Sequence, residues 1–332
     1  MKINEDYPKI SIFIAARNEE NNILDLLHSL EKLSYPKEQL QILIGNDGST
    51  DRTEEIIREF IIKKSKRRTA HYQIFNIEKQ VGELKGKANV LAQLAHFATG
   101  KYFFFTDADV EVPAQWIEEM PKINGVVTGI TLVKNSYWFE ACQAIEWFFA
   151  LYLMKRMTDF KLPSTGMGNN MMVSAEAYWA VGGYEKIGFS IVEDYALYKA
   201  VVNAGFEFRQ EYKPSLMTVT KPPPNYFEQR KRWVTGGIAS KSILIIPAFI
   251  QGLALPILLI ISLLNWKTSA LILLFNLLIN FFYGFRIFKK VGQIRLLKYI
   301  PVYTLYMYVF WFLQLVAYFL PTKLVWKGRR YN

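Results

Sequence analysis

The sequence predicts an α/β domain with a parallel sheet, followed by a helical region long enough and apolar enough to cross a membrane. Short apolar runs alternate with helical patterns in the first part, and long apolar runs replace them after residue 241. The charge changes at the same place. All 29 acidic residues lie before residue 241, where 29 of the 40 Lys and Arg residues offset them, so the net charge of +11 belongs to the rest of the chain.

The parallel sheet is predicted from three short, β-branched or aromatic runs. They cover residues 10–16, 41–45 and 101–106. Because these runs are mostly apolar and do not alternate with polar residues, they are typical of strands buried on both faces. Patterns with helical spacing cover residues 21–33, 53–62 and 87–97. Such alternation predicts a nucleotide-binding sheet, whose ligands lie beyond the carboxyl ends of the strands.

The composition limits the classes of partner. A basic chain can bind nucleic acid, but here the excess positive charge lies between long apolar runs, as it does in the cytosolic parts of membrane proteins. We therefore expect a membrane and no nucleic acid, and the sequence indicates no particular protein partner. The single cysteine, Cys142, excludes an internal disulfide and is expected to be a small buried apolar residue.

Three apolar segments are long enough to span a bilayer: 242–264, 269–287 and 299–320. The short connection 265–268 predicts a hairpin of the first two. The loop after the second segment is basic and is expected to be cytosolic. Residues 1–10 lack the apolar run of a signal peptide, so the sheet domain is also expected in the cytosol, at the inner membrane of a bacterium.

The third segment conflicts with this placement, because a full crossing would put the basic C-terminal tail outside. That tail carries Lys323, Lys327, Arg329 and Arg330. Three explanations stay open. Segment 299–320 is re-entrant, or Pro247 and Pro256 break the first segment, or the charge rule does not hold here.

We place the sheet domain at residues 1–240 and the helical region at 242–332. Two stretches of the first part are expected at the membrane surface, 136–160 and 225–241. The first is rich in aromatic residues, but Glu146 interrupts it and the remaining apolar run is too short to span a bilayer. A helix lying on the membrane and a helix partly buried in the core are both compatible with it.

Two carboxylates, Asp107 and Asp109, directly follow the strand at 101–106. A D-x-D pattern at a strand end can hold Mg²⁺ or Mn²⁺ between the phosphates of a nucleotide sugar, because these hard cations prefer oxygen ligands. The metal would neutralise the charge that develops on the leaving diphosphate. Alone the pattern is weak, because D-x-D also occurs in ordinary turns.

A polar cluster at 46–51, Asn-Asp-Gly-Ser-Thr-Asp, follows the second strand and leads into a helix. It suits a tight turn in which Ser49, Thr50 or Asp51 caps that helix. The carboxylate of Asp47 could also accept a hydrogen bond from the ring N–H of a uracil. Both interpretations can hold together.

Two adjacent acids, Glu193 and Asp194, precede an apolar helical pattern at 195–202. Acids at a helix start are often only favourable partners of the helix dipole. The functional interpretation is a general base, Asp194, that takes the proton from an attacking hydroxyl, with Glu193 orienting it or binding the acceptor.

The stretch 229–233, Gln-Arg-Lys-Arg-Trp, lies just before the membrane region. Basic residues there can contact lipid headgroups, and a tryptophan can anchor at the interface. Gln229 and Arg232 could instead bind a diphosphate while Trp233 gives an aromatic face to a sugar.

Taken in order, six motifs resemble those of the family-2 inverting glycosyltransferases, which have the GT-A fold. They are Ala-Arg-Asn-Glu at 16–19, Asn-Asp-Gly-Ser-Thr-Asp at 46–51, Gly-Lys-Ala at 86–88, Asp-Ala-Asp at 107–109, Glu-Asp at 193–194 and Gln-x-x-Arg-Trp at 229–233. The resemblance covers about residues 10–235, and the ordered set is more specific than any one motif. It implies a GT-A nucleotide-sugar-binding domain before the transmembrane helices.

For the donor, the resemblance implies that Asp47 contacts the base of the nucleotide in a pocket with Ala15, Ala16 and Glu19. Lys87 would lie near the nucleotide. The resemblance also implies that Asp107 lies near the ribose and the metal, and that Asp109 ligates the metal.

For the chemistry, the resemblance implies that Asp194 is the catalytic base. The matching Gln-x-x-Arg-Trp motif is shared by membrane polymer synthases and ceramide-type lipid glycosyltransferases. Two positions depart from the family pattern. Arg17 stands where a tyrosine is usual, and Val192 stands where processive synthases usually have threonine.

A glycine-rich segment, 166–171, falls between the metal motif and the proposed base. The resemblance places this region near the acceptor, so Asn169 and Asn170 are candidate contacts. A loop in which glycine only supplies the turn geometry is equally compatible.

The sequence thus predicts an enzyme that transfers a sugar by a single inverting displacement from a nucleotide sugar, expected to be a UDP-sugar although GDP stays open. A lipid acceptor at the cytosolic face is favoured, because three helices offer little to enclose a polymer channel. A processive polysaccharide synthase is the alternative. From another class, an inactive membrane protein that binds nucleotide sugars is disfavoured by the intact motifs.

Overall fold

The computed structural model describes residues 7–64, 71–163, 166–223, 225–320, 324–326 and 329–331. Contacts between residues divide the chain into two units, residues 1–131 with 157–220, and residues 132–156 with 221–332. Residues 1–6, Lys323 and Lys327, on which part of the predicted orientation depends, lie outside the described residues.

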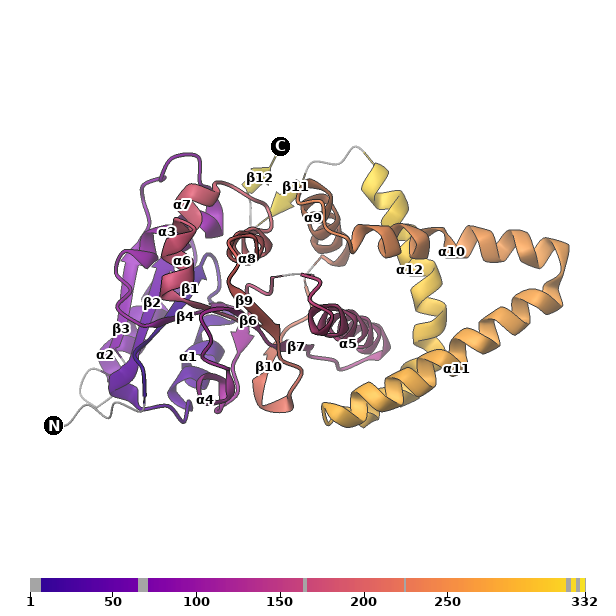
Figure 1. The fold of residues 1–332 in the computed structure, drawn as a ribbon, viewed down its shortest axis with the longest axis horizontal. Helices are drawn as coiled ribbons and strands as arrows, with labels where there is room; N and C mark the ends of the chain where they lie inside the picture. The colour runs from indigo at the N-terminus through magenta and orange to yellow at the C-terminus, as the bar shows by residue number, and fades with distance from the viewer. Residues whose placement is uncertain are drawn as a thin grey trace. The chain divides into compact units, whose positions relative to one another are not determined.

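The first unit is built on a seven-stranded sheet in the order β3-β2-β1-β4-β8-β6-β9 (Figure 1). Its strands are β1 (Ile10–Ala16), β2 (Leu40–Asn46), β3 (His71–Asn76), β4 (Tyr102–Asp107), β6 (Gly125–Thr128), β8 (Met171–Ser174) and β9 (Glu207–Gln210). Strands β1 to β4 pair in parallel, as the apolar runs predict for β1, β2 and β4. The sheet as a whole is mixed, because β8 runs antiparallel to both β4 and β6.

Helices cover both faces of this sheet. Side chains of one strand alternate between the faces, so Ile12 belongs to one hydrophobic cluster and Phe13 to the other. The cluster of Ile12 also contains residues of α1 (Ile23–Glu31), α2 (Thr53–Lys64) and α4 (Trp116–Glu119). The cluster of Phe13 contains residues of α3 (Gly86–Ala95), α6 (Ala175–Ala180), α7 (Gly183–Ile187) and α8 (Glu193–Asn203). Three layers result.

A small second sheet has the order β5-β10-β7. Its strands are β5 (Val110–Glu111), β7 (Ile130–Val133) and β10 (Met217–Thr220), and short 3₁₀ turns lie at Lys37–Gln39 and Pro214–Leu216. The predicted strands and helices of the sheet domain agree with the structure to within a few residues at each end. The sequence analysis missed four strands of the large sheet, β3, β6, β8 and β9, and the strands of the small sheet.

The second unit is helical. It contains most of α5 (Trp138–Asp159), α9 (Tyr226–Ala239), α10 (Ile245–Leu264), α11 (Trp266–Lys290), a 3₁₀ turn at Ile294–Tyr299, α12 (Ile300–Phe319) and the short strands β11 (Leu324–Trp326) and β12 (Arg329–Tyr331). Three helical stretches among the described residues are long and apolar enough to cross a membrane: Ile245–Leu264, Trp266–Lys290 and Ile294–Phe319. The three predicted apolar segments are thereby confirmed as helices.

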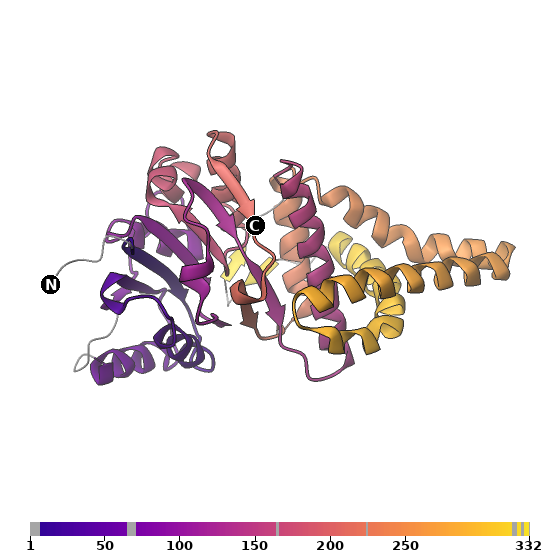
Figure 2. The same cartoon turned by 60° about the horizontal axis from the view of Figure 1, so that its bottom comes forward.

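Helices α10 and α11 form the predicted hairpin, which Figures 1 and 2 both show. One residue, Asn265, connects them, and its side chain accepts hydrogen bonds from the amides of Lys267 and Thr268 at the start of α11. Pro256 lies inside α10 without ending it, and Pro247 lies in the first turn. The explanation in which these prolines break the first segment is therefore wrong; prolines are tolerated in membrane helices because neighbouring groups satisfy the freed backbone.

One face of helix α5 is buried. Cys142, Ile145 and Phe148 have no exposed surface. Burial raises the pKa of the Cys142 thiol to about 12. Trp138 and Leu153 of the same helix are exposed, so a helix at the membrane surface and a partly buried helix both stay open for segment 136–160. Cys142 is the small buried residue that was expected.

Candidate active site

The polar clusters that follow β1, β2 and β4 meet at one edge of the sheet. In the strand register Ala15 of β1 pairs with Gly45 of β2 on one side and with Asp107 of β4 on the other. One residue further, Ala16 pairs with Asn46. The parallel order β2-β1-β4 therefore brings together the segments that begin at Arg17, Asp47 and Ala108. They lie beyond the carboxyl ends of the strands, where ligands of such sheets bind.

The predicted base pocket lies at the end of β1 and β2. Ala16 is fully buried, Ala15 is half-buried, and the carboxylates of Glu19 and Asp47 belong to residues with 4% and 8% of their surface exposed. The Asp47 amide donates to the Ala16 carbonyl at 2.9 Å. Arg17, the departure from the family pattern, donates from its guanidinium to the Asp47 carbonyl at 2.5 Å. The Arg17 side chain thus links the loop after β1 to the loop after β2.

The turn after β2 leads into α2, and the sequence predicts that Ser49, Thr50 or Asp51 caps this helix. Asp51 accepts a hydrogen bond from the Thr53 amide at 3.0 Å at the start of α2. The Thr53 hydroxyl in turn accepts from the Glu19 amide at 2.7 Å. The second bond links the loop after β1 to the start of α2.

Lys87, in the first turn of α3, joins the metal motif to the acidic pair. Its Nζ lies 2.6 Å from a carboxylate oxygen of Asp107 and 3.0 Å from one of Glu193. Burial of the amine opposes its charge, but the nearby carboxylates of Asp107, Glu193 and Asp194 outweigh that effect and raise the pKa of Lys87. Lys87 therefore stays protonated and offers a fixed positive charge between the two acidic motifs.

Asp194, in the first turn of α8, is held by the glycine-rich segment. The Gly168 amide donates to its Oδ2 at 2.7 Å, and the Tyr195 amide donates to its Oδ1 at 2.8 Å. A Cβ atom at Gly168 would lie 2.8 Å from Lys87 Nζ and 3.0 Å from Asp194 Cβ. The absence of a side chain at this position lets the loop approach both groups, which sequence analysis did not detect.

The two aspartates of the D-x-D motif offer carboxylate oxygens, the ligands that hard divalent cations prefer. Ala108 is buried, whereas Asp107 and Asp109 on either side of it are partly exposed. Within the described residues, no group of three or more His, Cys, Asp and Glu side chains forms a complete metal site. Mg²⁺ in such enzymes is commonly held by one or two carboxylates and the phosphates of the substrate, so these two aspartates fit that ion.

The two asparagines of the glycine-rich segment differ. Asn170 has no exposed surface, and its amide donates to the carbonyls of Ile130 at 2.8 Å and Leu216 at 2.7 Å. Its Oδ1 accepts from the Trp116 indole at 2.9 Å. These bonds make Asn170 part of the scaffold, and its predicted contact with the acceptor stays a prediction. Asn169 is half-buried, and its Oδ1 accepts from the Thr131 hydroxyl.

The Gln-x-x-Arg-Trp motif lies on α9, in the helical unit. Gln229, Arg232 and Trp233 are spaced by three and four residues, so they share one face of the helix. Trp233 stacks on Trp147 of α5, with 4.9 Å between the ring centres. The predicted contacts of these three residues with the donor stay predictions.

Arg230, inside the same motif, is buried rather than directed to lipid headgroups. Its guanidinium lies 2.5 Å from the carboxylate of Glu146 on α5, and it lies over the rings of Trp233 and Tyr226. Tyr306 of α12 donates to the same carboxylate at 3.3 Å. Burial raises the pKa of the Glu146 carboxyl, and the Arg230 charge and the hydrogen bonds oppose this rise.

Sequence analysis treated this basic stretch as one cluster and missed the pair. A signal was present, because Glu146 is a lone acid in an aromatic helix, and a buried charge needs a partner. The pair fixes α9 to α5 and so determines how the motif is presented.

Comparison with known proteins identifies the family. Residues 11–181 match the family described as Glycosyl transferase family 2, and residues 107–320 match Glycosyl transferase family group 2. A poly-beta-1,6-N-acetyl-D-glucosamine synthase of Staphylococcus epidermidis is 30% identical over 241 residues, which is 69% of this chain and 54% of that protein. A beta-monoglucosyldiacylglycerol synthase of Nostoc is 24% identical over 71% of this chain and 50% of that protein. The chain thus spans about half the length of these relatives.

The fold is also similar to a solved structure. A mannosyltransferase from Pyrobaculum calidifontis, determined with GDP-Man and Mn²⁺, aligns with a TM-score of 0.57 and 17% identity, covering 90% of this chain and 88% of that one. This similarity confirms the predicted GT-A type of α/β fold. The sheet with its clustered strand ends, the helices that follow it and the matches over both parts lead to one conclusion: the chain belongs to glycosyltransferase family 2.

Proposed function

We propose that this enzyme transfers a sugar, with inversion, from a UDP-sugar to a hydroxyl group of a lipid at the cytosolic face of a bacterial inner membrane. One observation carries the proposal. Lys87 lies within 2.6 Å of Asp107 and 3.0 Å of Glu193, beside Asp194, so the residues assigned to the leaving group and to the base form one cluster.

In the proposed reaction, Asp194 accepts the proton of the acceptor hydroxyl as that oxygen attacks the anomeric carbon. The bond from this carbon to the diphosphate oxygen breaks, and the nucleoside diphosphate leaves with the bonding pair. The hydrogen bonds from Gly168 and Tyr195 orient the Asp194 carboxylate. Glu193 is held by Lys87 and assists by fixing the start of α8.

A second group of residues would stabilise the departing diphosphate. Asp107 and Asp109 would hold Mg²⁺ or Mn²⁺, which supplies neutralising charge for the diphosphate. Lys87 adds a fixed positive charge nearby. Asp47, with Ala15, Ala16 and Glu19, would bind the base of the nucleotide. Gln229, Arg232 and Trp233 would complete the donor site.

A lipid acceptor is supported by the helical unit. Its three long apolar helices give the enzyme a place in the membrane from which a lipid is reached directly. A relative of 24% identity is a beta-monoglucosyldiacylglycerol synthase. The competing candidate is a processive polysaccharide synthase, because a relative of 30% identity is a poly-beta-1,6-N-acetyl-D-glucosamine synthase.

The test is release of nucleoside diphosphate by the purified protein in lipid nanodiscs with Mn²⁺ or Mg²⁺, across UDP- and GDP-sugars. Mass spectrometry of the lipid extract then identifies the product. We expect a UDP-sugar to be consumed and one lipid to gain a single sugar mass. A ladder of additions would replace the proposal by the processive synthase. Donor binding without release for any sugar and lipid extract would support the inactive binding protein.

The orientation has its own test, a reporter protein fused after Asn332. Because the C-terminal residues are basic, we expect a cytosolic signal. A signal from the outer side would contradict the placement by charge.

A further inference from the structure

The end of α11 and the turn that follows it carry a dense group of positive charges. Five cations, which we call the basic end, lie there: Arg286, Lys289, Lys290, Arg295 and Lys298. All five residues are exposed. The chain from residue 241 onward contains no Asp or Glu, so no acid nearby in the sequence offsets these charges.

The basic end has a defined backbone. Gly292 follows α11 with a φ of +70°, in the left-handed region that favours glycine. The Gln293 amide donates to the Phe288 carbonyl at 2.7 Å, which closes the helix end in the manner of a Schellman motif. The turn at Ile294–Tyr299 is anchored by Leu296, which has no exposed surface. The cations are therefore carried on an ordered helix end and turn.

Helix stability explains only part of this charge. Lys289 and Lys290 lie in the last turn of α11, where cations suit the negative end of the helix dipole. Arg295 and Lys298 lie instead at the start of the helical stretch Ile294–Phe319, where the dipole disfavours cations. The placement of these two residues does not stabilise the helix that follows them, and it therefore points to an anionic partner.

The end of α5 brings a further cation to the same surface. Tyr283 of α11 packs against Tyr152 of α5, with 5.5 Å between the ring centres. Arg156, at the end of α5, and Arg286 both lie close enough to the Tyr283 hydroxyl for their charges to act on it. Two guanidinium groups from segments far apart in the chain thus lie on either side of one tyrosine.

The helical unit has little acid with which to balance this surface. Its acidic residues are Glu140, Glu146 and Glu228. Glu146 is paired with Arg230. Glu140 lies about 24 Å from Arg156 along α5, because an α-helix rises 1.5 Å per residue. The charge of the basic end therefore calls for an anion from outside the chain.

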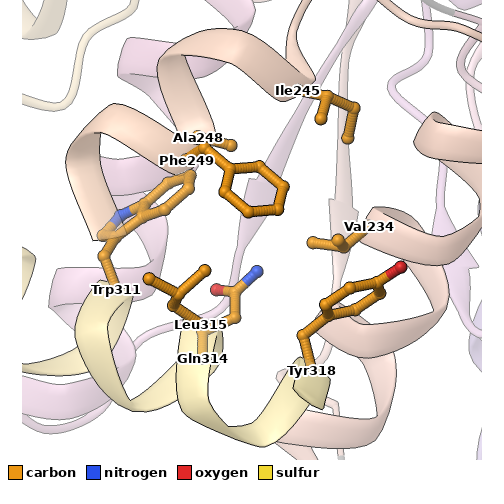
Figure 3. A pocket seen from close by; sticks show the side chains of 8 residues that line it. All are labelled: Val234, Ile245, Ala248, Phe249, Trp311, Gln314, Leu315 and Tyr318. Carbon is orange, nitrogen blue, oxygen red and sulfur yellow. The ribbon is translucent and has the colours of Figure 1, made fainter. Parts of the chain in front are cut away.

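The surface beside the basic end selects the kind of anion. Phe282 and Phe285 of α11 and Leu305 of α12 have exposed side chains. Another face of α12 packs against α9 and α10, where mostly apolar side chains line a small hollow beside Gln314 (Figure 3). Large apolar side chains exposed next to cations are typical of a helix end at a membrane surface, where hydrocarbon meets phosphate. A soluble polyanion would contact the cations and leave these apolar side chains in water.

We propose that the basic end binds the phosphate groups of anionic phospholipids at the membrane surface where α11 ends and α12 begins. Both helices are candidate membrane spans, so the residues that join them lie at the level of the headgroups. Lysine and arginine at that level attract anionic lipid. The inference goes beyond the proposed function, because this binding requires neither a nucleotide sugar nor an acceptor.

The experiment measures phospholipid binding to the full chain in a non-ionic detergent by native mass spectrometry, without nucleotide sugar. Phosphatidylglycerol and phosphatidylcholine with the same acyl chains are the two probes. We expect the parent protein to bind phosphatidylglycerol more tightly. Lys289→Gln should weaken that binding about fivefold, and Arg295→Gln with Lys298→Gln about 25-fold, because each cation near an anionic lipid surface contributes about fivefold. Binding of phosphatidylcholine should stay the same in every variant.

The matched control is Lys267→Gln, the same change on the same helix at an exposed residue about 33 Å from Lys289. It removes one charge from the chain but none from the basic end, so it should leave the affinity for phosphatidylglycerol unchanged. Lys289→Arg keeps the charge and should keep the affinity, which separates loss of charge from disturbance of the fold. Melting curves establish that each variant is folded.

Three results would overturn the proposal. The first is equal binding of the two lipids by the parent protein. The second is an equal loss of phosphatidylglycerol binding in Lys267→Gln and Lys289→Gln, which would show an effect of net charge alone. The third is a single-stranded oligonucleotide that binds as tightly as phosphatidylglycerol, because nucleic acid would then be the partner. Transfer assays run separately show whether the proposed function stands.

Discussion

The guanidinium of Arg230 lies 2.5 Å from the carboxylate of Glu146, although 84 positions separate the two residues in the chain. Glu146 has 5% and Arg230 has 7% of its surface exposed. Neither charge can be solvated by bulk water, so each depends on the other. This pair fixes α9, which carries the Gln-x-x-Arg-Trp motif, to α5. Because the pair is buried, dissolved salt screens it only weakly.

Removing one partner of this pair should be severely destabilising. Glu146→Ala leaves the Arg230 charge buried without its carboxylate, and we expect the free energy of unfolding to fall by about 3–5 kcal/mol. Chemical denaturation in a fixed detergent measures the change. The double variant Glu146→Leu with Arg230→Leu removes both charges, and it should recover most of the lost stability. If the single variant is as stable as the parent protein, the pair does not carry this role.

Asp194→Asn should remove transfer without removing the donor. The amide keeps an oxygen that can accept from Gly168 but cannot act as a base, so we expect the rate to fall by about 10²- to 10⁴-fold. Calorimetric titration with the nucleotide sugar should give a dissociation constant close to that of the parent protein. A loss of binding in step with activity would remove Asp194 from the role of base.

Gly168→Ala tests whether the close approach of the glycine-rich loop matters to the chemistry. The new methyl group would lie 3.0 Å from Asp194 Cβ, so the loop and the carboxylate must move apart. Displacements of this kind at a reacting group cost about 100-fold in rate, and we expect kcat to fall accordingly. The melting temperature serves as the control for folding. Unchanged kcat would show that the loop does not orient Asp194.

Removal of divalent metal should stop turnover reversibly. Excess chelator is expected to abolish release of nucleoside diphosphate, and added Mn²⁺ or Mg²⁺ should restore it, because Asp107 and Asp109 offer hard oxygen ligands. Asp109→Asn should require a higher Mn²⁺ concentration for half-maximal activity. Full activity in excess chelator would exclude both aspartates from a metal role.

Strands β1, β2 and β4 were predictable because each is a continuous apolar run buried on both faces. Strand β3 was not, because its burial alternates between exposed and half-buried positions and its sequence, His-Tyr-Gln-Ile-Phe-Asn, has no apolar run. The antiparallel course of β8 could not be read either, since it depends on which strands it meets after a long excursion of the chain.

The meeting of the acidic residues that follow β1, β2 and β4 was predictable, because the ends of parallel strands lie at a common edge. The position of Glu193 and Asp194 was not, because they begin a helix and follow none of these strands. The contacts that orient these residues were not. The bond from Gly168 to Asp194 uses a backbone amide, which every residue has, so no side-chain pattern reveals it. Likewise, the sequence around Arg230 does not indicate whether this residue contacts lipid headgroups or pairs with Glu146, as it does in the structure.

The amide of Asn170 bonds to the carbonyls of Ile130 and Leu216, and it accepts from the indole of Trp116. A ribosome delivers these partners in order, so the last of them becomes available only after residue 216 has emerged. By then residues 132–156, which belong to the other unit, have already been synthesised. The sheet unit therefore consists of two stretches of chain, and it can complete its interior only after the second stretch has been synthesised. For the same reason, a single cut in the chain cannot separate the two units into two consecutive fragments.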